Sequence, residues 1–151
     1  MPFDYSFTFL AIVTHDDAIS ILFKINIMSE SLFERLGGTT GISSIVDEVV
    51  AAHMTNPAIS ARFTPYIEQP ERLAAIRQHT IDFFSFGSGG PVTYTGRDMI
   101  TTHKGMNISA AEFVHVVDDI LMVLDNHKVD GESKKEVLAI LWSLKGMVIG
   151  Q

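Results

Sequence analysis

Apolar side chains recur at helical spacing along the chain. The first clear stripe follows an i, i+3, i+4, i+7 pattern and stops at Asn56-Pro57. Its members are Ile42, Ile45, Val46, Val49, Val50 and, at its end, His53. The β-branched residues would permit a strand, but the stripe does not alternate and is longer than an ordinary strand. The pattern therefore predicts a helix.

Later stretches carry the same periodicity. Residues 70–86 form a predicted helix that the glycine-rich residues 87–91 end. One face of it carries Leu73, Ile76, His79 or Thr80, and Phe83. The next helix starts at a capping box, Ser109 to Glu112. Its stripe is Phe113, Val116, Val117, Ile120, Leu121 and Leu124. The last helix opens near residue 131 and carries Val137, Ile140, Leu141, Leu144 and Val148. No strand of consequence is predicted, so the fold class is all-α.

The length, composition and net charge of the chain limit the classes of protein to which it can belong. A chain of 151 residues with 46% hydrophobic content suits one domain with its own core. A net charge of −7 argues against binding to nucleic acid or to an anionic membrane. The absence of cysteine excludes disulfides and thiolate sites, and fits a reducing compartment. We therefore expect a cytoplasmic protein without a membrane-spanning segment.

The first 27 residues differ in their pattern from the rest of the chain. Residues 7–13 are apolar, His15-Asp16-Asp17 interrupts them, and the start carries Asp4 and no basic residue, unlike a secretory signal. We expect an extra N-terminal arm over residues 1–30 and one domain over residues 31–151. Met28 is then the expected native start, with residues 1–27 added by an upstream start codon. The alternative is a genuine arm that packs on the domain or on a partner.

His103 is the main candidate for chemistry. It ends a short candidate helix that Gly96-Arg97-Asp98 opens, with Met99 and Thr102 on the same face. Breaker residues follow it before the next helix begins. A neutral imidazole is a common ligand for metals, including haem iron. A lone histidine beside apolar residues is nevertheless often a plain core or surface residue, so the residues alone leave both interpretations open.

Several spaced motifs resemble one family. They are Leu36-Gly37-Gly38-Thr39-Thr40, Phe63, Gly89-Gly90-Pro91, Tyr94-Thr95-Gly96 and His103. From residue 32 to about residue 148 the sequence resembles the truncated haemoglobins, in particular their first group. The resemblance implies a two-over-two helical sandwich around haem b (iron protoporphyrin IX), with His103 as the proximal iron ligand. Helices of this length could otherwise form a plain bundle or a cofactor-free sensor or interaction domain.

The resemblance also implies roles for other residues. Phe63 would pack on the haem face and Met99 on the proximal edge of the porphyrin. The remaining expected cofactor-binding residues are Ile76, His79, Thr80, Phe83 and Phe113. His79 is in addition a candidate distal iron ligand, the alternative being a half-exposed histidine at the helix edge. His53 is expected to be buried and hydrogen-bonded rather than a ligand.

The distal side departs from the family pattern. Val49 and Val50 stand where many members of the group carry a Phe-Tyr pair, and Ile76 stands at a position that is often glutamine. None of the three can donate a hydrogen bond to a bound gas. Only His79 or Thr80 could compensate, and a threonine hydroxyl can instead bond back into its own helix.

The resemblance implies a haem protein that binds oxygen, nitric oxide or carbon monoxide, with oxygen transport among its uses. Conversion of nitric oxide to nitrate would need an external reductase, since the chain has no nucleotide or flavin site of its own. The alternative is a six-coordinate haem, held by His103 and His79, for electron transfer or for redox or gas sensing. No catalytic residue is expected, and the protein is expected to be a monomer or a weak homodimer.

Overall fold

The computed structural model describes residues 16–17, 19–22 and 30–151. The chain divides into two compact units, residues 1–30 and residues 31–151. In the first unit the described residues 16–17 and 19–22 are helical, and Ile19, Ile21 and Leu22 are exposed. Met28, the expected native start, lies outside the described residues.

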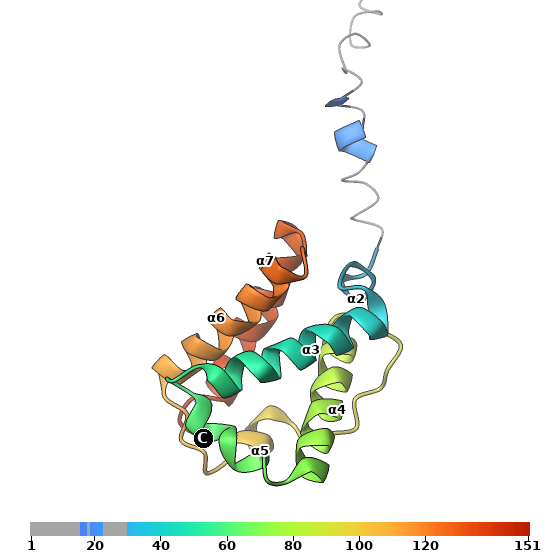
Figure 1. Cartoon of the computed structure of the whole chain (residues 1–151). Helices are drawn as coiled ribbons and strands as arrows, with labels where there is room; N and C mark the ends of the chain where they lie inside the picture. Colours follow the sequence, from blue (N-terminus) through green and yellow to red (C-terminus); the bar gives the residue numbers. More distant parts are fainter. Residues whose placement is uncertain (1–15, 18, 23–29) are drawn as a thin grey trace, which may run out of the picture. The chain divides into compact units, whose positions relative to one another are not determined.

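The second unit consists of helices joined by short connections, apart from the longer segment 88–98 between α4 and α5 (Figure 1). In chain order they are α2 (Leu32–Arg35), α3 (Gly38–Thr55), η1 (Ser60–Arg62), η2 (Thr64–Tyr66), α4 (Pro70–Gly87), α5 (Met99–His103), α6 (Ala110–Asn126), α7 (Gly131–Leu144) and η3 (Lys145–Met147). Within the described part of the chain the only β pairing is an isolated bridge between Ile108 and Ile149. The prediction of an all-α fold is confirmed.

Two helix pairs form the body of this unit. α3 packs against α4 and also against α6, while α6 packs against α7 (Figure 1). The apolar stripe of α3 and the second half of that of α6 meet in one core, to which α3 supplies Ile42, Ile45, Val46 and Val49 while α6 supplies Ile120 and Leu124. α2 adds Leu32 and Leu36 to this core, beside Val137 of α7. None of the described helices is long and apolar enough to cross a membrane.

The predicted helix starts are confirmed. Ser109 caps α6 in a reciprocal pair of bonds: its hydroxyl accepts from the Glu112 amide at 3.1 Å, and the Glu112 carboxylate accepts from the Ser109 amide at 2.9 Å. Asp130 caps α7 by accepting from two backbone amides of the first turn. A further capping box, Ser31 with Glu34, opens α2 and was not predicted. These caps satisfy amides that have no partner inside the helix.

Glycine is required at the turns on either side of α3 and α4. Gly37, between α2 and α3, has a φ of 86°, in the left-handed region that favours glycine. After α4 the constraint is space, because a Cβ at Gly90 would lie 2.5 Å from the ring of Phe33 and 2.7 Å from the Ser85 carbonyl oxygen. The glycine-rich stretch therefore permits the chain to turn closely against α2 and the end of α4.

Replacement of Gly90 by alanine tests this close packing. Because the Cβ would meet backbone, Gly90→Ala should lower the free energy of unfolding by about 1–3 kcal/mol. Gly87→Ala is the matched control, since nothing lies within 4 Å of a Cβ there, and it should be neutral or stabilising by up to about 1 kcal/mol. Denaturant unfolding of both variants makes the comparison, and equal effects would contradict the packing argument.

Candidate functional site

His103 lies at the end of α5, which Asp98 opens. The Asp98 carboxylate accepts from the Thr101 amide at 2.8 Å and from its hydroxyl at 2.9 Å, and these bonds hold the pKa of Asp98 below its ordinary value. The half-buried imidazole of His103 places Nδ1 2.8 Å from the carbonyl oxygen of Met99. A carbonyl only accepts, so Nδ1 carries the proton and Nε2 keeps its lone pair. Nε2 has no hydrogen-bond partner among the described residues.

This arrangement is typical of a histidine that binds a metal. Metal-ligating imidazoles usually donate their second ring N–H to a carbonyl or a carboxylate, which fixes the tautomer and the ring orientation. No cluster of three or more His, Asp or Glu side chains that could hold a bare metal ion occurs in the described residues.

α4 presents a half-buried apolar stripe. Leu73, Ile76, Thr80 and Phe83 are each partly accessible and recur at helical spacing. The Thr80 hydroxyl donates to the Ile76 carbonyl at 2.9 Å, inside its own helix, as the sequence allowed. His79 is exposed, whereas the stripe is half-buried, so it lies at the solvent edge of this face.

Tyr94 connects α4 to the segment that enters α5. Its ring meets Phe83 edge-on, with 5.4 Å between the ring centroids, and its hydroxyl donates to the Arg97 carbonyl at 2.9 Å. The ring also lies against Gly96, where any Cβ would overlap it. The Tyr-x-Gly element thus has a steric basis, and it brings Phe83 next to the approach to His103.

Phe63 lies between η1 and η2, against the imidazole of His53. The two ring centroids are 5.0 Å apart. His53 is buried and donates from Nδ1 to Asp119 on α6 at 2.9 Å, while Asn56 donates to the second carboxylate oxygen at 2.9 Å. The prediction that His53 is buried and hydrogen-bonded is confirmed. Burial lowers the pKa of His53, although the bond to Asp119 opposes this shift.

Asp119 was missed by the sequence analysis. A carboxylate inside the apolar stripe of α6 is the signal that could have found it, since buried charges are rarely left without partners. The described residues supply that partner from α3, in the form of His53 and Asn56. The pair therefore ties α3 to α6 beneath Phe63.

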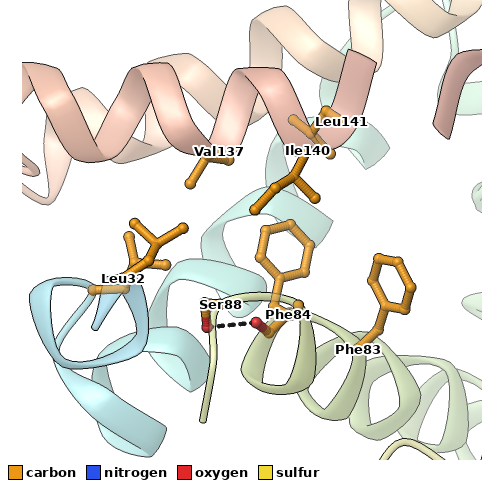
Figure 2. Close-up of a pocket in the computed structure, with 9 residues that line it drawn as sticks. Leu32, Phe83, Phe84, Ser88, Val137, Ile140 and Leu141 are labelled. Carbon is orange, nitrogen blue, oxygen red and sulfur yellow. Dashed lines mark hydrogen bonds between the residues drawn. The ribbon is translucent and has the colours of Figure 1, made fainter. Parts of the chain in front are cut away.

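Phe113 and Phe83 lie in different apolar groups. Phe113 is buried with Val117 and Val148, and its ring is tilted against Trp142. Phe83 instead lines a small apolar pocket between α2, α4 and α7 (Figure 2). Its other lining residues are Leu32, Leu36, Phe84, Gly87, Ser88, Val137, Ile140 and Leu141. Neither His103 nor Phe63 lines this pocket, so it is separate from the position of the candidate ligand.

The residues present fit a haem. A haem needs one axial donor, and Nε2 of His103 is a nitrogen that could serve as one. It also needs apolar side chains for its flat faces, and Leu73, Ile76 and Phe83 on α4 remain partly accessible for that purpose. Met99 of α5 is likewise half-buried.

Comparisons with known proteins point to the same class. A profile of the family described as bacterial-like globin matches residues 31–149. A group 1 truncated hemoglobin, GlbN, of Nostoc sp. (strain MUN 8820) is 25% identical over 121 residues, which are 80% of this chain and 98% of the relative. The truncated hemoglobin of Tetrahymena pyriformis in its Fe(III) form has a TM-score of 0.72 at 19% identity, covering 81% of this chain and all of that one. The 2/2 hemoglobin of Synechococcus sp. PCC 7002 has a TM-score of 0.66 at 21% identity, covering 77% of this chain and 94% of that one.

The buried His53 predicts a dependence of stability on pH. Its pKa is lowered in the folded state from an ordinary value of 6.5, so below that value the unfolded chain binds the proton more readily. Stability should therefore be constant above pH 6.5 and fall as the pH drops below it, by at most about 1.4 kcal/mol per pH unit for one proton.

His53→Gln is the matched variant, because it keeps an amide donor for Asp119 but does not titrate. The free energy of unfolding, measured from neutral to mildly acidic pH, should decline less steeply in this variant than in the wild type. Identical slopes would show that His53 does not contribute to the dependence.

Proposed function

Because this chain belongs to the bacterial-like globin family, and is therefore a haem protein that binds diatomic gases such as oxygen, we propose that His103 holds the haem iron from the proximal side. The observation that carries this proposal is the bond from Nδ1 of His103 to the Met99 carbonyl at 2.8 Å. That bond leaves Nε2 as the donor and raises its basicity. Haem iron then supplies an open coordination position at which a diatomic gas binds reversibly.

The apolar side chains around His103 would retain the cofactor. We propose that Met99 packs on the proximal edge of the ring and that Phe63 packs on its face. Ile76, Thr80 and Phe83 of α4 would cover the haem face opposite to His103, and Phe113 of α6 would be a further contact. The partial exposure of these side chains, except the buried Phe113, supports this assignment, since apolar side chains that stay accessible gain free energy when a ligand covers them.

The distal side favours weak retention of the gas. Val49 and Val50 have no donor, and the Thr80 hydroxyl is already bonded to Ile76. We infer that the protein binds oxygen, nitric oxide or carbon monoxide, and that bound oxygen dissociates rapidly. The exposure of His79 favours an iron without a second histidine over the six-coordinate alternative. Conversion of nitric oxide to nitrate would need both an external reductase and a long-lived oxygen complex, which an apolar distal side disfavours.

Replacement of His103 tests the proximal assignment. His103→Ala should lose stable haem binding, or keep a weakly held haem that added imidazole restores, because the axial donor is gone. The Soret absorption of the haem-loaded chain is the measurement, and His115→Ala on the exposed side of α6 is the control. Wild-type iron coordination in His103→Ala would refute the assignment.

A donor introduced on the distal side should slow the loss of oxygen. A charge-assisted hydrogen bond is worth roughly 1.5–3 kcal/mol, or about one to two powers of ten in rate. Val50→Tyr should therefore slow oxygen dissociation by that factor if the ring fits, as measured by stopped-flow mixing. Val50→Phe is the control, because it adds the ring without the hydroxyl, and equal rates in the two variants would contradict a hydrogen bond.

His79 has its own test. We expect His79→Leu to leave carbon monoxide association and the ferrous spectrum unchanged, because the side chain is exposed. Faster carbon monoxide association together with loss of a low-spin ferrous spectrum would instead identify His79 as an iron ligand. Faster oxygen dissociation alone would identify it as a hydrogen-bond donor.

A further inference from the structure

A single guanidinium group joins three segments around the loop that follows His103. Arg62, the last residue of η1, donates from Nη1 to the Met106 carbonyl oxygen at 2.6 Å. It also donates from Nε and Nη2 to the two carboxylate oxygens of Glu112, at 2.7 and 3.1 Å. The contact therefore connects η1, the loop between α5 and α6, and the first turn of α6. Phe63 follows Arg62 directly in the chain.

The peptide between Met106 and Asn107 is held at both of its polar ends. Its carbonyl accepts from Arg62, and its N–H, which belongs to Asn107, donates to the carbonyl of Gln151 at 2.7 Å. Asn107 has a φ of 47°, which is uncommon for a residue with a side chain. The Met106 N–H in turn donates to the His103 carbonyl at 3.0 Å. Arg62 is thus linked to the backbone of His103 through one residue.

Glu112 anchors the guanidinium firmly. Its carboxylate also accepts from the Ser109 amide in the capping box of α6. The bond from Arg62, followed by those from Ser109, lowers the pKa of Glu112 to about 2. The carboxylate therefore stays ionised at neutral and mildly acidic pH. A bidentate pair of this kind also fixes the plane of the guanidinium, which aims its remaining N–H groups.

We propose that Arg62 is a positioning residue for the proximal side of the haem site, where it fixes the Met106–Asn107 peptide and, through it, the backbone of His103. This inference rests on the proximal role of His103 proposed above. His103 is the last residue of a five-residue helix, so the loop after it sets where its backbone ends. A displaced loop would tilt the imidazole without breaking its bond to Met99.

Arg62→Met tests the proposal, and Arg35→Met is the matched control. Arg35 makes contacts of the same kind, at 2.7 Å to the Ser133 hydroxyl and 2.7 Å to Glu136, but they join α2 to α7. In the haem-loaded full chain, Arg62→Met should speed amide exchange at Asn107 by about tenfold, the loss expected for one charge-assisted bond. The iron–histidine stretching band of the ferrous protein should also shift or broaden. Arg35→Met should change neither property.

The conservative and reciprocal variants complete the test. Arg62→Lys keeps the positive charge but loses the planar set of N–H donors of the guanidinium. It should restore part of the wild-type exchange rate and band. If Arg62→Met does not fold, Glu112→Gln should show a smaller change in the same direction. Wild-type exchange at Asn107 and an unshifted band, in a variant that loses as much stability as Arg35→Met, would overturn the proposal. Failure of the proximal assignment is separate, because it appears in His103→Ala, whereas the exchange rate reports on the loop alone.

Discussion

The central constraint on this structure is that the helix carrying His103 is too short to be stable alone. Isolated helices shorter than about 12–15 residues are marginal in water, since nucleation fixes several residues for the first hydrogen bond. α5 has five residues, so its position must come from outside. The Asp98 cap supplies its start, and Arg62 with the C-terminal residues holds the loop beyond it. The geometry of the candidate ligand is therefore a property of tertiary contacts.

Polar contacts between distant segments also fix the position of another irregular part of the domain. His53 and Asp119 join α3 to α6 beneath Phe63, while Arg62 joins η1 to α6 one residue earlier. For the buried pair of His53 and Asp119, leaving either partner alone would cost more free energy than replacing both. Both pairs converge on the short 3-10 turns between α3 and α4, where regular hydrogen bonding is poorest. They give this irregular segment, and Phe63 within it, a defined position.

The helices were predictable because periodicity and caps are local signals. Neighbouring residues are enough to recognise the apolar stripe of α6 and its capping box at Ser109. The same holds for the end of α3 before Asn56. The contacts of Arg62 with Met106 and Glu112 were not predictable, since these residues are distant from Arg62 in sequence and the capping role of Glu112 does not indicate a second partner. For the same reason the sequence could not choose between His79 and Thr80 on α4. That choice depends on which face the tertiary packing leaves half-buried.

The two sides of the candidate site differ in how many polar contacts they make. On the α4 side the accessible residues are apolar or have their hydroxyl satisfied, so a bound gas would meet dispersion forces and little directed polarity. On the His103 side the imidazole Nδ1 and both polar groups of the Met106–Asn107 peptide have partners. A site with no distal hydrogen bond depends on its proximal ligand for control of the iron. If His103 holds the iron as proposed, the bonds of Arg62 to the loop and the apolar face of α4 would together leave the control of gas affinity to the position of the imidazole.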